Sequence, residues 1–152
     1  MKKNIINIID EPMFEAKAYK LSNKEKIICS IARKLGINKF SKRAEKYDNE
    51  ASFPTENYKD LHKAGLLAIC IPEINGGLGA SFKTYCLAAA EVGRYCGATA
   101  LTWNMHVCST LWTGSLADDL NMSKEFHKNH RKQRKIHYER IIKKGAIYSQ
   151  PF

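Results

Sequence analysis

Apolar residues recur at helical spacing along most of the chain and divide it into a series of predicted helices. Ser22 and Glu25 have the spacing of a capping box, and an apolar stripe with a period of about four residues follows them. This pattern predicts a long helix that bends at Gly36 and ends near Asp48. Residues 1–21 show no strong period, so we expect them to form a loosely ordered lead-in.

The most concentrated apolar run, residues 66–71, lies between Gly65 and Pro72 and leads into a glycine cluster at positions 76, 77 and 79. A short helix that begins at Thr55 is expected to end at Gly65. The cluster predicts a tight turn that sets the angle between neighbouring helices, because glycine tolerates positive φ and close backbone approach. A phosphate cradle is the alternative. The stretch lacks the lysine and hydroxyl of a P-loop and the spacing of the dinucleotide fingerprint.

Ser81 caps a further predicted helix, in which Phe82, Tyr85 and Cys86 are expected to face inward and Glu91 outward. The next helix, residues 99–113, is uncharged and nearly apolar all round, which predicts central burial. One of its stripes is polar and consists of Thr102, His106, Ser109 and Thr113, with Trp103 and Thr110 at its border. Such groups either bond to their own helix and to nearby carbonyls, or they face water or a ligand.

The 152 residues are 44% hydrophobic, which is ordinary for one globular domain. No apolar run approaches the roughly 20 residues of a membrane span, and the charges near the start interrupt any signal-peptide core. Five cysteines, an odd number without a Cys-x-x-Cys pair, indicate reduced thiols. The sequence therefore predicts a cytoplasmic protein without a membrane span.

Most of the net charge of +10 lies in a predicted basic helix that begins after Ser123 and runs to about Lys144. Phe126 falls on its predicted inward face, so Tyr138 is the one aromatic residue interleaved with its Lys and Arg residues, and nucleic acid is a disfavoured partner. A solvated face is the simpler interpretation. The alternative is a non-catalytic helical interaction module whose basic helix binds an acidic partner.

Three histidines, His127, His130 and His137, share one side of that helix and raise the question of a metal site. Their spacing matches no zinc motif, and Arg131 and Arg134 lie beside them, where positive charge opposes a cation. We therefore assign no metal ligand.

Several motifs, taken in order, resemble the N-terminal helical domain of the acyl-CoA dehydrogenase family of flavoproteins, from about Ile27 onward. They are Asp48 with Phe53-Pro54, Leu61 with Gly65-Leu66-Leu67, Ile71-Pro72-Glu73 with Gly76-Gly77-Leu78-Gly79, Glu91-Val92-Gly93-Arg94, Thr99-Ala100-Leu101 with His106, and Gly145 before a strand-like segment. The resemblance implies an all-α fold. Residues 22–145 would form the N-terminal α-helical domain, and residues 146–152 would begin the first strand of a middle β-domain that is missing here.

The resemblance also implies an FAD-dependent oxidoreductase of fatty acid metabolism that acts on the CH–CH group of an acyl thioester such as acyl-CoA. Electron-transfer flavoprotein or another acceptor would take the electrons, and the complete enzyme would be a homo-oligomer. Acyl-CoA oxidases and flavin monooxygenases are built on the same fold and stay open as alternatives.

The family's flavin-contacting segment corresponds here to Tyr148, Ser149, Gln150 and Pro151, with the Ser149 hydroxyl bonding the flavin. The same resemblance places Trp103, His106 and Thr110 in the lining of the acyl cavity. In the family the catalytic base comes from a C-terminal helical bundle that this sequence lacks. We therefore assign no catalytic residue, and we expect the chain to be inactive alone.

Overall fold

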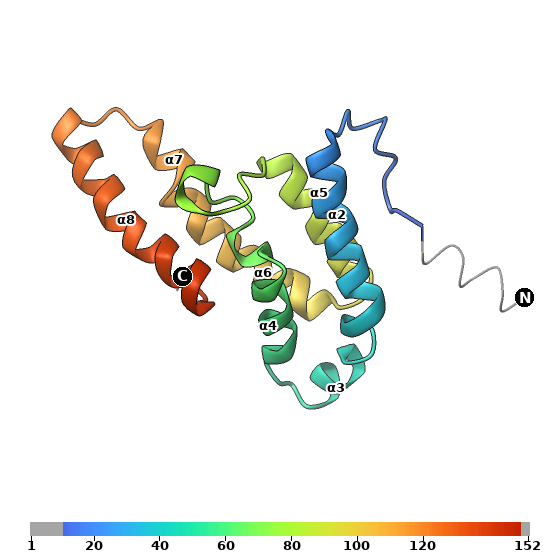
Figure 1. Ribbon diagram of the computed structural model, residues 1–152. Helices are drawn as coiled ribbons and strands as arrows, with labels where there is room; N and C mark the ends of the chain where they lie inside the picture. Colours follow the sequence, from blue (N-terminus) through green and yellow to red (C-terminus); the bar gives the residue numbers. More distant parts are fainter. Residues whose placement is uncertain (1–10, 150–152) are drawn as a thin grey trace, which may run out of the picture.

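The computed structural model describes residues 11–149, and every regular element in that range is helical (Figure 1). The predicted all-α fold is confirmed. In chain order the elements are α2 (Asn23–Leu35), the π-helical turn η1 (Gly36–Phe40), α3 (Ala44–Asn49), α4 (Thr55–Lys63), the 3-10 turns η2 (Leu66–Ala68) and η3 (Glu73–Asn75), α5 (Phe82–Gly93), α6 (Gly97–Trp112), α7 (Ser115–Asp118) and α8 (Lys124–Lys144). None of the helices within residues 11–149 combines the length and hydrophobicity that crossing a bilayer requires.

The first helix begins at the predicted capping box. The Glu25 N–H donates to Ser22 Oγ at 3.3 Å, and the Ser22 N–H donates to the Glu25 carboxylate at 2.8 Å. The helix geometry changes at Gly36, where a bend was predicted, and α3 ends at Asn49, close to the predicted end. A single helix over this range is wrong, because α2 gives way to the π-helical turn and residues 41–43 form a further turn before α3. A Cβ at Gly36 would lie 2.2 Å from Cδ2 of Tyr95, so only glycine lets the turn approach the end of α5 this closely.

The core lies where α5 packs against α2 on one side and α6 on the other, and Figure 1 shows α2 and α5 side by side. Ala32 of α2, Ala88 and Val92 of α5 and Val107 of α6 are fully buried there. Small side chains at these positions let the helix backbones approach closely. α8 lies along one edge of the molecule and contacts η2 and η3, burying only Tyr138 and Ile141.

The glycine-rich stretch forms a joint between α4 and α5, which we define as residues 65–81. Gly65, Gly76 and Gly79 have φ values of 75°, 89° and 60°, which favour glycine. The N–H groups of residues 76–79 all donate to carbonyls of the joint itself, those of Glu73, Pro72, Ala68 and Ile71. These amides are therefore committed to the turn, and the structural interpretation replaces the phosphate cradle.

The inward faces of α5 and α6 differ from the predicted ones. Phe82 is 59% exposed and Cys86 is exposed, whereas Glu91, expected to face solvent, is 3% exposed. On α6, Leu101 is 69% exposed, so the helix is not buried all round by the described part of the chain. His106 and Ser109 of the polar stripe turn inward instead, with Trp103 and Thr110 at its border, whereas Thr113 is exposed.

A buried polar cluster ties the start of α6 to α4 and to the turn after η1. Asn57, which is fully buried, donates through Nδ2 to Thr99 Oγ1 at 2.9 Å and accepts from Arg43 Nη1 at 2.9 Å. Arg43 and Lys39 both pair with the Asp60 carboxylate, at 2.8 and 2.5 Å. Each buried polar group of the cluster has a partner, so the cluster fixes the position of α6 without leaving a polar atom unsatisfied.

Candidate functional site

The hydroxyls of the polar stripe on α6 bond mainly to their own helix. Thr102 Oγ1 donates to the Ala98 carbonyl at 2.8 Å, and Ser109 Oγ donates to the Met105 carbonyl at 2.9 Å. Thr110 Oγ1 donates to the Val107 carbonyl at 2.8 Å. Such local bonds satisfy a buried hydroxyl without a ligand.

His106 is the exception, because both of its ring nitrogens bind groups outside α6. The ring is fully buried, with Nε2 at 2.9 Å from the Leu67 carbonyl oxygen in η2. The Tyr148 backbone N–H donates to Nδ1 at 3.0 Å. Burial holds the pKa of His106 below its usual range, although the bond to the Leu67 carbonyl opposes this shift. One side chain therefore joins three segments that lie far apart in the sequence.

The segment after α8 passes close to this histidine. Gly145 ends α8 with a φ of 65°, and Tyr148 then packs its ring against both His106 and His137. The Tyr148 hydroxyl lies 2.8 Å from His137 Nδ1. Ser149 is exposed. Residues 146–149 pair with no other segment as a β-strand within the described residues.

Of the four expected cofactor residues, the structure describes Tyr148 and Ser149, while Gln150 and Pro151 lie outside the described residues. Ser149 makes no hydrogen bond to the described part of the chain, and its exposed hydroxyl and backbone are chemically suited to the polar edge of a flavin ring. Of the two described residues, Ser149 therefore fits the expected contact.

The three residues expected to line the acyl cavity all lie in the core. Trp103 and His106 are fully buried, and Thr110 is 6% exposed. Trp103 packs edge-on against Tyr85, with ring centroids 5.4 Å apart, and its Nε1 has no hydrogen-bond partner among the described residues. None of these three residues contributes to the lining of the two cavities described next.

The first of these two cavities is a groove of about 790 Å³ on the opposite side of α6. Cys108, Leu111 and Trp112 of α6 line it together with Phe82 and Pro72 from the joint and the start of α5. Sequence reasoning expected residues 99–113 to be buried all round and therefore missed this groove. Phe82 and Trp112, two large apolar side chains that are 59% and 47% exposed, mark the groove. Their exposure is known only from the packing of the helices.

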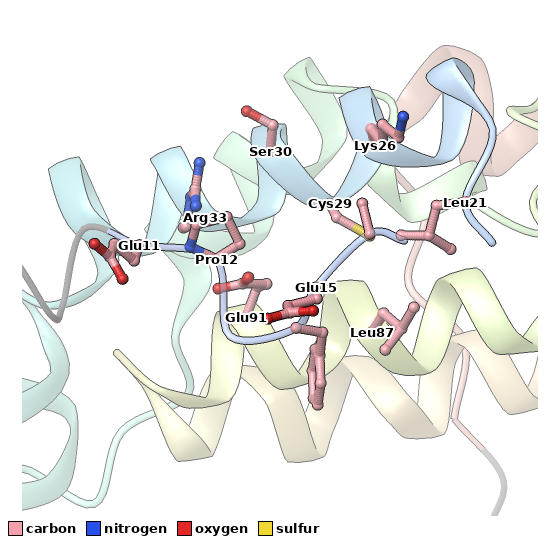
Figure 2. Close-up of a pocket in the computed structure, with 12 residues that line it drawn as sticks. Glu11, Pro12, Glu15, Leu21, Lys26, Cys29, Ser30, Arg33, Leu87 and Glu91 are labelled. Carbon is pink, nitrogen blue, oxygen red and sulfur yellow. The ribbon is translucent and has the colours of Figure 1, made fainter. Parts of the chain in front are cut away.

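The second cavity, of about 460 Å³, lies under the N-terminal segment, where that segment crosses α2 and α5 (Figure 2). The Met13 N–H donates to Oε1 of buried Glu91 at 2.7 Å, and Arg94 donates to the Glu11 carbonyl at 2.7 Å. These bonds tie residues 11–13 to α5. Residues 1–10 of the expected lead-in lie outside the described residues.

One carboxylate, that of Asp118, pairs with two arginines of the basic helix α8. Asp118 of α7 accepts from Arg134 at 2.6 Å and from Arg131 at 3.3 Å, and these bonds lower the pKa of Asp118. His127 lies 3.1 Å from the Leu120 carbonyl through Nε2. Within residues 11–149, no three His, Cys, Asp or Glu side chains are placed to hold a metal ion together.

These features define a helical domain whose last described residues form a partly exposed segment, ending at Ser149, beside α6. The family model described as "Acyl-CoA dehydrogenase, N-terminal domain" matches residues 22–115. The chain belongs to the acyl-CoA dehydrogenase family. The match covers α2 to α6 and supports the resemblance drawn from the motifs.

The relatives are much longer than this chain. A probable acyl-CoA dehydrogenase of Bacillus subtilis is 29% identical over 56% of the chain and 22% of its own length. The acryloyl-CoA reductase (NADH) of Anaerotignum propionicum is 30% identical over 59% of the chain and 23% of its own length. The human short-chain specific mitochondrial acyl-CoA dehydrogenase is 34% identical over 48% of the chain and 17% of its own length. The aligned part thus spans about a fifth of each relative, and no solved structure is significantly similar to the chain.

Proposed function

We propose that this chain supplies the N-terminal domain of an FAD-dependent oxidoreductase that acts on the CH–CH group of an acyl thioester. Membership of the family and the names of the relatives support this assignment. The observation that carries it furthest is the position of Tyr148 and Ser149. They follow α8 and lie beside α6, and Ser149 exposes its polar groups where the resemblance expects the first flavin contact.

In this proposal the Ser149 hydroxyl and backbone and the Tyr148 carbonyl bind the flavin, because the Tyr148 N–H is already bound to His106. Gln150 and Pro151 continue the contact. Bound FAD would supply the acceptor for a hydride from the substrate. This chain contributes binding and orientation, and the base that removes the substrate proton comes from another part of the enzyme. The chain alone is then an incomplete catalyst.

For the acyl thioester we propose α6 as one wall of the binding cavity. Trp103, His106 and Thr110 are buried, so they contribute from behind that wall by setting its position. The apolar groove side of α6, with Leu111 and Trp112, offers the kind of surface that an acyl chain favours. Electron-transfer flavoprotein or another acceptor, and a homo-oligomeric state, complete the proposal for the whole enzyme. The unpaired cysteines of the described residues support a reducing, cytoplasmic location.

Flavin content tests the assignment. We expect the 152-residue chain to purify without FAD, and the enzyme that contains this domain with its β-domain and helical bundle to purify with it. Acyl-CoA added without oxygen should bleach the flavin of that enzyme. Reoxidation by air or only by an added acceptor then separates an oxidase or monooxygenase from a dehydrogenase. A complete enzyme without flavin, or with flavin that no acyl-CoA reduces, would refute the proposal.

One surface feature favours a second function, that of a module binding an acidic partner. Lys124, Lys128, Lys132 and Lys135 fall on one face of α8, are exposed and form no ion pair within residues 11–149. We call this face the cationic stripe. Unpaired cations in a row attract a polyanion through a salt-sensitive interaction.

A further inference from the structure

We propose that His106 is a positioning residue that holds the backbone of Tyr148 and Ser149 in place, as a neutral imidazole with its proton on Nε2. We call the two hydrogen bonds of the His106 ring, to Tyr148 and to Leu67, the His106 bracket. The step from the bracket to flavin binding rests on the proposed function, whereas the bracket itself does not.

The hydrogen bonds determine the tautomer. The Tyr148 backbone N–H can only donate, so Nδ1, 3.0 Å away, must accept and carries no proton. A neutral ring then carries its proton on Nε2, which donates to the Leu67 carbonyl oxygen at 2.9 Å. The opposite tautomer would place two donors together at Tyr148 and two acceptors together at Leu67.

Among the described residues, the bond from the Tyr148 N–H to His106 is the one hydrogen bond that joins residues 145–149 to the domain outside α8. The N–H groups of Gly145 and Ala146 donate to carbonyls of α8, and the Tyr148 hydroxyl pairs with His137, also of α8. Without His106 the segment would be positioned by the end of α8, which buries two residues, and by the packing of the Tyr148 ring. The hydrogen bond to His106 therefore fixes the backbone next to the exposed groups of Ser149.

The bracket also satisfies a buried carbonyl. Within the described residues no backbone N–H donates to the Leu67 carbonyl, and Leu67 is 1% exposed. Because a buried acceptor without a donor is costly, the two bonds of His106 support each other. If His106 were only structural, the bond that matters would be the one to the Leu67 carbonyl. If His106 positions the segment after α8, the bond that matters is the one from the Tyr148 N–H.

Two substitutions separate these roles. In His106→Asn the side-chain oxygen can occupy the place of Nδ1 and still accept from Tyr148, while the Leu67 bond is lost. In His106→Gln the amide nitrogen can reach the place of Nε2 and still donate to Leu67, while the Tyr148 bond is lost. Ser109→Ala removes a buried hydroxyl of the same helix and serves as the matched control.

Amide hydrogen exchange of the 152-residue chain measures the bracket directly. The ratio of the exchange rate at Tyr148 to that at Val107, a core amide of α6, removes effects on global stability. We expect His106→Gln to raise this ratio about tenfold, as loss of one buried hydrogen bond implies, and His106→Asn and Ser109→Ala to change it less than threefold. Equal ratios in the two His106 variants would overturn the proposal.

The unmodified chain provides a test that needs no variant. The nitrogen chemical shifts of the His106 ring should report a neutral imidazole protonated on Nε2 at pH 7. A ring protonated on Nδ1, or on both nitrogens, would overturn the proposal even if both variants failed to fold.

FAD affinity tests the link to the cofactor in the enzyme that contains this domain. We expect FAD to dissociate about tenfold more readily from His106→Gln than from His106→Asn, whose affinity should stay near that of the unmodified enzyme. Equal affinities would refute the link to flavin. An unmodified enzyme that holds no FAD would instead refute the proposed function and leave the exchange result standing.

Discussion

The joint between α4 and α5 can be tested at Gly77, where the structure allows no side chain. A Cβ there would lie 2.1 Å from the Ile71 carbonyl oxygen and 2.5 Å from Ile71 Cβ. Ile71 is 1% exposed, and its carbonyl already accepts from the Gly79 N–H at 2.8 Å. The backbone at Ile71 therefore cannot move aside without breaking the turn.

We expect Gly77→Ala to lower the free energy of unfolding by about 3 kcal/mol, the upper end of the usual cost of overpacking, because the clash involves backbone atoms. For a domain of this size the loss corresponds to a fall in Tm of roughly 6–12 °C. Gly97→Ala is the matched control. Nothing lies within 4 Å of its added Cβ, so better helix propensity should leave the protein unchanged or raise its stability by about 0.5 kcal/mol.

Urea unfolding followed by far-ultraviolet circular dichroism measures both variants. The denaturant midpoint should fall for Gly77→Ala while the slope m stays constant, because the same surface is exposed on unfolding. A Gly77→Ala variant within 0.5 kcal/mol of the unmodified chain would show that the joint is not packed as described. A destabilised Gly97→Ala variant would show that the comparison does not isolate the clash.

Two further predictions concern charged groups. Hydrogen bonds from Thr84 and from the Ser22 backbone lower the pKa of Glu25 to about 2, so its ionised form stabilises the fold at pH values above the unfolded pKa near 4.5, and this contribution is lost as the pH falls from there toward 2. Glu25→Gln should therefore flatten the fall in Tm between pH 5 and pH 2, and an unchanged profile would contradict the assignment. Replacing the cationic stripe by glutamine should leave Tm within 2 °C and abolish any salt-sensitive binding to an acidic protein, whereas Arg134→Gln should lower Tm because Arg134 is bound to Asp118. If binding by the stripe variant persists, the charge of α8 is only a solvated face.

The sequence predicted the helix starts well because capping is local. Ser22, Ser81 and Ser123 each accept a backbone N–H three residues on, at 3.2–3.3 Å, as their spacing indicated. The glycine joint was also predicted, since positive φ leaves a strong compositional signal. In both cases the determining contacts lie within a few residues of the signal.

The inward faces were predicted poorly because their partners are distant in the sequence. Glu91 sits on the buried stripe of α5, where it accepts from the backbone of Met13, 78 residues away. A charged residue on a buried stripe conceals the apolar period that sequence reasoning uses. The groove beside Trp112 was missed for a related reason. A helix that is apolar all round gives no period from which to choose a face.

The same reasoning explains why His106 could be flagged but not interpreted from the sequence. A buried histidine on a helix needs two partners, and the stripe pattern shows neither the Leu67 carbonyl nor the Tyr148 N–H. The glycine joint supplies the first partner, because its 3-10 turn leaves the Leu67 carbonyl without a backbone donor inside the core. The turn at Gly145 supplies the second partner by directing the chain back toward α6. The joint, α6 and the segment after α8 are thus coupled through one ring, so a change that shifts η2 should also move Tyr148 and the exposed groups of Ser149.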